Sequence, residues 1–500
     1  MSDVTQHPAV NTYTNAELDV SGSAKYIDEP GLLAPSYRAA TIGIVGMVSV
    51  VAFEAMGSAT IMPAAAASLD GIFLYGFLFG GPLAVSLLGM VLAGRWSDQR
   101  SPMRPVWIGI SCFVAGLMVA ALSSSIWWLL LGRLGTGLGS GMIGVALYAL
   151  VGRAYPAALH SRIFAVFAAA WMLPALIAPG LAGLISELLG WRYGIAIAAV
   201  LALPVCAALT RIPLSQAEKL PTAGTSSPDR RMLWAIGASV GAVLLHLLGQ
   251  ARPGGADGSR PSVAVTLLFG AALGLLLLSA RRLWPAGSLA AKRGLPAAIA
   301  LSGLSQGAFF AAEAFLPLLL HREKGASVGL AGLVLSAGAI SWSAGAFCRA
   351  RLHQRVSVER LLRSGFSLLG SGIVVSTLVL VPSAPVSVAI LGWILAGAGM
   401  GLVSPTLSVV TLALASPGAH GQTGASLRLS AALTTTAALA LSGAVFALLL
   451  GVNATAAYAI SLGLAALLAV LGVFLSDRVE GEPRNTFTPA RAAAVRRNSD

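Results

Sequence analysis

Charged residues are scarce in this chain of 500 residues. Only 10% of them are Asp, Glu, Lys or Arg, whereas 56% are hydrophobic. A soluble domain carries about 25% charged residues, so this chain has too little polar surface to stay dissolved. Most of it must face lipid, or pack against helices that face lipid. The shortage of charge argues against a soluble enzyme and predicts an integral membrane protein.

Cysteine is also scarce, and further absences narrow the function. The three cysteines, Cys112, Cys206 and Cys348, lie far apart in separate apolar runs, which fits neither a metal site nor a disulfide framework. No phosphate-binding loop with its lysine occurs, which argues against ATP-driven transport. The net charge of +13 resides in short loops and not on a basic face with aromatic residues, so we expect no nucleic-acid partner. We also expect no cofactor and no metal.

Long apolar runs are what the chain has in abundance. A transmembrane helix needs about 20 mostly apolar residues, and fourteen runs of roughly that length can be counted. They lie near 39–62, 72–95, 105–122, 126–151, 162–186, 193–210, 232–250, 263–280, 296–320, 327–348, 361–381, 385–414, 425–450 and 454–476.

The runs form six helices, an inserted pair and six more helices. Polar segments on both sides set the pair apart, and its two runs, of 19 and 18 residues, are the weakest. A re-entrant or surface hairpin would leave the loop charges unchanged, but the length of each run favours spanning. The predicted units are an N-terminal tail at 1–37, a six-helix bundle at 38–211, a loop at 212–231, the inserted pair at 232–280, a loop at 281–295, a second bundle at 296–476 and a C-terminal tail at 477–500.

Basic residues predict the orientation. If the N-terminus is cytoplasmic, 26 of the 32 Lys and Arg residues fall inside the cell, five fall outside and Arg133 lies within a run. Cytoplasmic loops carry the excess of Lys and Arg, so both termini should be cytoplasmic in a multi-pass protein of the cell membrane. Arginine outnumbers lysine 28 to 4, which points to a bacterial source.

A short polar loop follows the second run. It reads GRWSDQRSPMR and places Gly94, Asp98, Arg100 and Arg104 together. A tight turn between two helices accounts for its length. Taken alone, these residues fit a solvated basic loop without a specific function as well as they fit a functional motif.

The fourth run contains an arginine among glycines. It reads LLLGRLGTGLGSGMIG, which places Arg133 inside the membrane and repeats GxxxG at 135/139 and 137/141. An arginine at this depth costs about 2.5–3.5 kcal/mol on insertion scales. It should face the protein interior or water, unless it lies near a helix end and extends to the interface. The glycines allow close approach of other helices.

The fifth run carries a proline and glycine motif, WMLPALIAPGLAG. Pro174 and Pro179 remove backbone donors and bend the helix, while Gly180 and Gly183 thin it. A generic kinked helix is the alternative interpretation.

Two acids lie well inside apolar runs. Glu54 occurs in FEAMGSATIMP, nine residues before Pro63, and Glu313 occurs in FFAAEAFLP. Ionisable residues at such depth are expensive and mark ion or substrate pathways, although either acid could instead hydrogen-bond a neighbouring helix. Asp70 and Glu187 lie near the outer ends of helices, where a charge costs little.

These motifs, in this order, resemble those of the major facilitator superfamily. Gly94 and Asp98 match the loop between the second and third helices of that family, where the resemblance implies a gate formed with the neighbouring arginines. Gln99 stands where a basic residue is usual, and Ser101 stands where glycine is usual. Arg133 resembles the arginine of proton-coupled members, which lies near the proton pathway.

The first and fifth runs resemble the exporting branch of the superfamily. The fifth is similar to the antiporter motif, with Pro179 and Gly183 kept and Pro174 and Ala178 in place of glycines. Glu54 stands where the fourteen-helix drug:proton antiporters carry an aspartate. The resemblance implies a proton-binding acid, for which Glu54 is the first candidate and Glu313 the competitor.

The resemblance covers roughly residues 38–476. It implies an all-α membrane fold of two six-helix bundles around a central cavity, with the inserted pair at the periphery. We therefore expect a secondary transporter that acts as a monomer and exports amphipathic or hydrophobic compounds by alternating access in exchange for protons. A transporter of one metabolite, such as a lipid precursor, siderophore or amino acid, is the nearest alternative. A membrane sensor without transport is the third.

Overall fold

The computed structural model describes residues 31–99, 101–212, 229–249, 263–284, 286–352, 355–414 and 420–479. Within these ranges it contains fourteen helices that are long and apolar enough to cross a membrane, and it contains no strand. The predicted all-α architecture and the number of spans are confirmed.

The helices are longer than the apolar runs that predicted them. In the N-terminal half they are α1 (Arg38–Ser68), α2 (Tyr75–Gln99), α3 (Met103–Ala121), α4 (Ile126–Ala154), α5 (Ala157–Leu189) and α6 (Trp191–Leu209). The inserted pair is α8 (Asp229–Gly249) and α9 (Val263–Leu283), and the C-terminal half holds α10 (Leu295–Lys324), α11 (Val328–Leu352), α12 (Val358–Thr377), α13 (Ser387–Ala413), α14 (His420–Leu450) and α15 (Ala454–Leu475). Short 3-10 turns occupy Ile72–Leu74, Leu378–Leu380 and Ser476–Val479.

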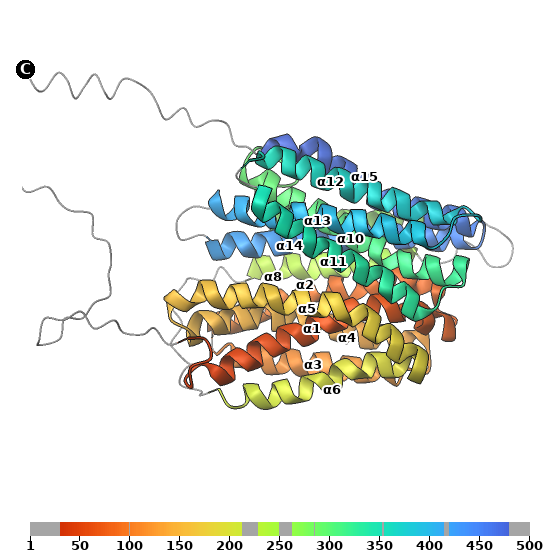
Figure 1. The fold of residues 1–500 in the computed structure, drawn as a ribbon. Helices are drawn as coiled ribbons and strands as arrows, with labels where there is room; N and C mark the ends of the chain where they lie inside the picture. The colour runs from red at the N-terminus through yellow and green to blue at the C-terminus, as the bar shows by residue number, and fades with distance from the viewer. Residues whose placement is uncertain are drawn as a thin grey trace, which may run out of the picture.

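The two halves form separate bundles with the same packing pattern (Figure 1). In the first bundle α1 packs on α5 and α6, α4 on α2 and α3, and α3 on α6. In the second, α10 packs on α14 and α15, α13 on α11 and α12, and α12 on α15. The bundles meet along two main seams, α2 with α14 and α5 with α11. These seams are equivalent, because α2 corresponds to α11 and α5 corresponds to α14 in the packing pattern. The contacts therefore repeat with pseudo-twofold symmetry.

The ends of the helices define two faces of the molecule. The end of the molecule at which α1 begins and α15 ends, on the left in Figure 1, is called the tail face. The loop face is the opposite end, where α1 turns into α2 beside Asp70. Since α2, α3 and the later helices alternate in direction, each helix joins these two faces.

Glycines let α4 lie close to two neighbours. A Cβ atom at Gly139 would lie 2.5 Å from the carbonyl oxygen of Gly109 in α3. On the adjacent side, Gly137 and Gly141 face the backbone of α2 at Pro82 and Ser86, with too little space for a side chain. Contact at this range provides the van der Waals packing that joins helices in lipid. The predicted role of the two GxxxG repeats agrees with this geometry.

In the second bundle, glycines let α13 lie close to two neighbours in the same way. A Cβ atom at Gly399 would lie 2.5 Å from the carbonyl oxygen of Gly365 in α12. Gly397 and Gly401 face α11 with equally little space, and at Gly401 the nearest contacts include Gly345. Gly137 and Gly141 of α4 thus correspond to Gly397 and Gly401 of α13.

The inserted pair joins the bundles at one seam only. Helix α8 packs on both α2 and α14, whereas α9 packs mainly on α8. The hydroxyl of Ser239 in α8 donates a hydrogen bond of 2.6 Å to the carbonyl oxygen of Ala84 in α2. The fully buried ring of His246 stacks on Phe77 of α2, with centroids 5.2 Å apart. Helix α8 is therefore part of the interface between the bundles, and α9 alone is peripheral.

A substitution at Gly80 tests this docking. A Cβ atom there would overlap the ring of His246, so Gly80→Leu should overpack the α2–α8 contact, at a cost of about 1–3 kcal/mol. Thermal unfolding in detergent should show a lower midpoint, and His246→Ala in the same chain should restore at least half of the loss. Gly144→Leu is the matched control, since open space surrounds Gly144. An equal loss in the control, or no rescue by His246→Ala, would contradict the docking geometry.

Candidate functional site

A buried ion pair links α1 and α4. The carboxylate of Glu54 and the guanidinium of Arg133 form a salt bridge through Oε1 and Nη1. Glu54 is 8% exposed and Arg133 is 6% exposed. Arg133 therefore faces the protein interior as predicted, and the structure brings it together with the first candidate acid.

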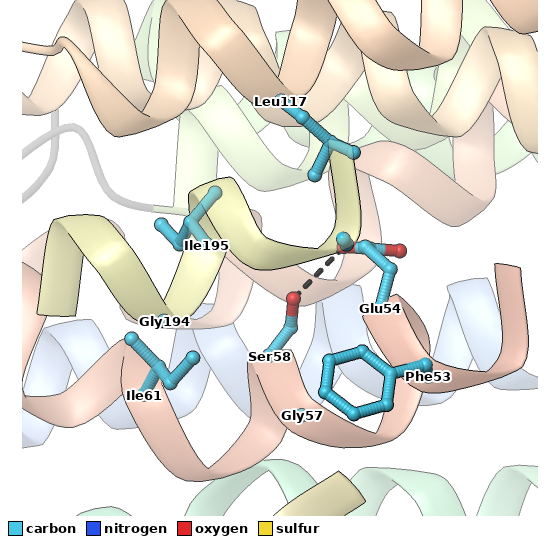
Figure 2. Close-up of a pocket in the computed structure, with 9 residues that line it drawn as sticks. Phe53, Glu54, Gly57, Ser58, Ile61, Leu117, Gly194 and Ile195 are labelled. Atoms are coloured by element: carbon cyan, nitrogen blue, oxygen red, sulfur yellow. Dashed lines mark hydrogen bonds between the residues drawn. The ribbon is translucent and has the colours of Figure 1, made fainter. Parts of the chain in front are cut away.

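Further hydrogen bonds complete the environment of both charges. The hydroxyl of Ser58, one turn after Glu54, donates a hydrogen bond of 2.8 Å to its Oε1 (Figure 2). Nη1 of Arg133 also donates to Ser58 Oγ at 3.2 Å, and its Nε donates to the carbonyl oxygen of Leu78 in α2 at 3.3 Å. A buried pair is stable only when such bonds satisfy its remaining donors and acceptors. The network therefore joins α1, α2 and α4.

A small cavity lies beside this pair, inside the first bundle. Its volume is about 10 Å³, close to the smallest space that holds a water molecule. Glu54 and Ser58 line it from α1, Leu117 from α3, and Gly194 and Ile195 from α6 (Figure 2). The carboxyl group of Glu54 thus adjoins a space about the size of one water molecule, away from the seams between the bundles.

Glu313 has a different environment, in α10. It is 8% exposed and forms no hydrogen bond or ion pair with any residue that the structure describes. The next residue, Ala314, accepts a hydrogen bond of 2.7 Å from the hydroxyl of Tyr75 in α2. Phe315 packs on Tyr75 with ring centroids 5.9 Å apart. Glu313 is therefore a buried acid beside an aromatic contact between the bundles, without a fixed counter-charge.

The pseudo-symmetry shows why Glu313 lacks an arginine. Arg133 precedes Gly137 by four residues, and Trp393 precedes the corresponding Gly397 by four. Trp393 stacks on Phe309 of α10, with centroids 4.7 Å apart. The aromatic pair Phe309–Trp393 thus occupies the place that the Glu54–Arg133 ion pair has in the first bundle. Glu313 follows Phe309 by four residues, as Ser58 follows Glu54, so Glu313 corresponds to Ser58. The two acids are not equivalent positions of the two bundles.

The predicted gating loop is only partly described. Gly94 is half-buried near the tail-face end of α2, and Asp98 belongs to the last turn of that helix. Arg104 is exposed in the first turn of α3. The side chain of Asp98 and the whole of Arg100 lie outside the described residues, so the gate itself stays a prediction.

The proline and glycine motif of α5 lies at the seam with α11. The helix runs without interruption through Pro174 and Pro179, and both prolines are buried. A Cβ atom at Gly183 would lie 3.0 Å from Gly329 of α11, whereas Gly180 has ordinary van der Waals contacts with that helix. The motif therefore allows the two bundles to approach closely near the loop face.

Three contacts between the bundles were not anticipated from the sequence. Glu187, at the loop-face end of α5, accepts a hydrogen bond of 2.7 Å from the backbone N–H of Gly329 in α11. Tyr75 bonds to α10 as described above. At the tail face the guanidinium of Arg428 in α14 donates to the hydroxyl of Tyr148 in α4 and lies 4.5 Å from its ring centroid. Ser58 was also missed, although its spacing of four residues from Glu54 could have revealed it.

Among the described residues no group of three or more His, Cys, Asp or Glu side chains could hold a metal ion. The three cysteines are free thiols.

Comparison with known proteins agrees with this architecture. The model of the Major Facilitator Superfamily matches residues 44–426. The chain belongs to the major facilitator superfamily. The family and the fold are those of transporters, and the fourteen apolar helices make this major facilitator a multi-pass membrane protein.

Two relatives illustrate the range of similarity. A "probable multidrug-efflux transporter" of Mycobacterium tuberculosis is 24% identical over 402 residues, which cover 75% of this chain and 80% of that protein. An uncharacterized transporter of the same type from Bacillus subtilis is 27% identical over 124 residues, which cover 24% of this chain and 28% of that protein.

Solved structures share the fold at low sequence identity. A POT family transporter in complex with 5-aminolevulinic acid superposes with a TM-score of 0.64 at 16% identity, covering 88% of this chain and 96% of the other. The nucleoside transporter NupG gives a TM-score of 0.60 at 13% identity, covering 87% and 99%. At such identities the likeness shows the fold alone.

The ion pair predicts a clear pattern of stability. Removing one partner leaves an uncompensated buried charge and costs about 3–5 kcal/mol, so Arg133→Gln should lower the thermal midpoint in detergent strongly. Glu54→Gln should do the same, because Arg133 then lacks its counter-charge. The double variant should be more stable than either single variant. A double variant whose loss equals the sum of the single losses would contradict a direct ion pair.

Proposed function

We propose that this major facilitator exports amphipathic or hydrophobic small molecules in exchange for protons. The observation that carries the proposal is the buried Glu54–Arg133 pair, an ionisable unit deep in the first helix of the bundle. Intramembrane ionisable groups of this kind mark ion pathways. The resemblance of the first span to drug:proton antiporters, and the similarity to a probable multidrug-efflux transporter, support the same direction of transport.

Proton binding at Glu54 would change the contacts of α1. In the ion-paired form the carboxylate holds Arg133 and accepts from Ser58. A proton on Glu54 removes the charge that balances Arg133, so the guanidinium must find another partner, such as water or substrate. The small cavity beside Glu54 offers a first position for that water. Protonation and helix packing are thereby coupled in one place.

Glu313 is the competing proton carrier. It has no ion pair among the described residues, so its charge can change without breaking one. Its neighbour Ala314 bonds to Tyr75 of the other bundle, which would let a change at Glu313 act on the seam directly. The two candidates therefore differ in what their protonation would alter: α1–α4 packing in one case, the α2–α10 contact in the other.

Alternating access would break and remake the contacts between the bundles. Near the loop face the hydrogen bonds from Tyr75 to Ala314 and from Gly329 to Glu187 join them. At the tail face the contact joins Arg428 and Tyr148. Both sets are formed in this structure, so rocking one bundle against the other would open one set at a time and leave the other in place. The loop with Gly94, Asp98, Arg100 and Arg104 is proposed to stabilise one of these states.

The low charge of the spans favours an apolar or amphipathic substrate. An aromatic cluster lies one helical turn before Glu313: Phe309 stacks on Trp393 and meets Trp342 edge-on, with centroids 5.1 Å apart for the second pair. A carboxyl group near aromatic faces suits lipophilic cations. A panel of such cations, with an amino acid and a siderophore as polar controls, separates drug export from transport of one metabolite.

Transport in proteoliposomes tests the proton carrier. Glu54→Gln removes titration with little change of shape, so pH-gradient-driven uptake of a lipophilic cation should fall at least tenfold while downhill exchange persists. Ser58→Ala is the matched control: it removes a hydrogen bond to Glu54 but keeps the carboxyl group, and should retain coupled transport.

The double variant separates coupling from stability. If Glu54→Gln fails only because Arg133 is left unpaired, adding Arg133→Gln should restore uphill transport. If Glu54 carries the proton, the double variant should stay uncoupled. Coupled transport by Glu54→Gln together with its loss in Glu313→Gln would assign the role to Glu313.

The orientation is also proposed, with the tail face cytoplasmic. Most of the arginines lie at helix ends on the tail face, as at Arg38, Arg153 and Arg282, which is the arrangement of a cytoplasmic surface. The linker between α8 and α9 should then be extracellular. Ser259 lies in this linker, outside the described residues.

A single cysteine reports this topology. With Cys112, Cys206 and Cys348 replaced by serine, Ser259→Cys should react with a membrane-impermeant thiol reagent added to intact cells. A cysteine at Arg355, on the tail face between α11 and α12, is the control and should react only after the cells are opened. The reverse labelling would overturn the proposed orientation.

A further inference from the structure

A groove lies between the two inserted helices, near the tail face. Its volume is about 430 Å³, within the range of about 300–1,000 Å³ of small-molecule sites. Leu233, Trp234 and Gly237 line it from the first turns of α8, and Leu275 and Arg282 from the last half of α9. The walls are apolar, and a cation lies at the end nearest the tail face.

Arg282 and Trp234 form the polar end of the groove. The guanidinium carbon of Arg282 lies 5.6 Å from the centroid of the indole ring. Arg282 is exposed, and it forms no ion pair or hydrogen bond with any residue that the structure describes. Tryptophan and arginine at the end of a membrane-spanning helix are typical of the headgroup region of a bilayer.

The surroundings of the groove are basic at one end and apolar along its length. Arg281 adjoins Arg282 at the end of α9, and Arg95 of α2 contacts Met232 at the start of α8. Toward the middle of the pair, Leu277 and Leu278 of α9 are about half exposed. Helix α9 packs mainly on α8, so this apolar surface faces the bilayer. The groove therefore combines a positive charge at the tail-face end, where a lipid headgroup lies, with apolar walls toward the middle of the membrane.

We propose that the groove between α8 and α9 binds an anionic phospholipid from the leaflet at the tail face. The phosphate binds the guanidinium of Arg282 beside the Trp234 ring, since arginine donates in a planar fork that matches phosphate oxygens. One acyl chain lies along Leu233, Gly237 and Leu275. Basic pockets between membrane-spanning helices hold phospholipid headgroups in this way.

The apolar walls distinguish a lipid from a free phosphate ion. A phosphate ion would use only Arg282, because the other lining side chains carry no charge. A phospholipid uses the whole groove, and its second chain stays in the bilayer beside α9. The groove and its charge would bind such a lipid whichever substrate the protein transports.

Native mass spectrometry of the delipidated, detergent-solubilised full chain tests the proposal. Phosphatidylglycerol should bind in a saturable 1:1 complex, whereas phosphatidylcholine with the same chains should bind several times more weakly. Arg282→Gln should weaken phosphatidylglycerol binding about fivefold, the effect of one arginine at a charged lipid surface. Leu275→Trp, which fills the groove, should remove the 1:1 complex.

The matched control is Arg281→Gln, the adjacent exposed arginine that does not line the groove. It should leave the affinity for phosphatidylglycerol nearly unchanged. Equal weakening by Arg281→Gln and Arg282→Gln would mean that the lipid is held by general electrostatic attraction and not at a specific site. Competition by glycerol phosphate at equal concentration would assign the site to a free anion. A dimer that lipid dissociates would assign the groove to a second copy of the chain. Any of these three results overturns the proposal.

Discussion

A charged side chain deep in a membrane-spanning helix persists only beside a group that compensates its charge, and the Glu54–Arg133 pair meets this constraint in the first bundle. The pair does more than neutralise two charges. Through Ser58 and the carbonyl oxygen of Leu78 it joins α1, α2 and α4. A change of protonation in this network would therefore remove contacts that join three helices.

The two bundles use one backbone plan for different chemistry. Glycines let α4 and α13 approach two neighbours each, because no Cβ atom separates the backbones. On this common framework the first bundle places the ion pair, whereas the second places the stacked rings of Phe309 and Trp393. Glu313 is left with no counter-charge among the described residues. The symmetry of the packing therefore does not extend to the polar groups, and the two acids have distinct surroundings.

The inserted pair adds a second asymmetry. Helix α8 bonds to α2 through Ser239 and stacks His246 on Phe77, and it also packs on α14. The equivalent seam between α5 and α11 has no such helix among the described residues. Relative motion of the bundles must therefore carry α8 with one side or slide it against the other. Helix α9, which packs mainly on α8, leaves an apolar face exposed and contributes Arg282 to the proposed lipid groove.

The sequence by itself determined the membrane class, the fourteen spans and the division into six, two and six helices, because these depend on long apolar runs and the composition of single segments. It also indicated that Arg133 must face inward, since lipid does not stabilise a charge at that depth. Only the tertiary structure decided that Glu54 is the partner of Arg133, that Trp393 and Phe309 occupy the corresponding place, and that α8 lies in a seam. These facts depend on which faces of distant helices meet. Glu54 and Arg133 lie 79 residues apart in the sequence, so no local sequence pattern indicates their contact.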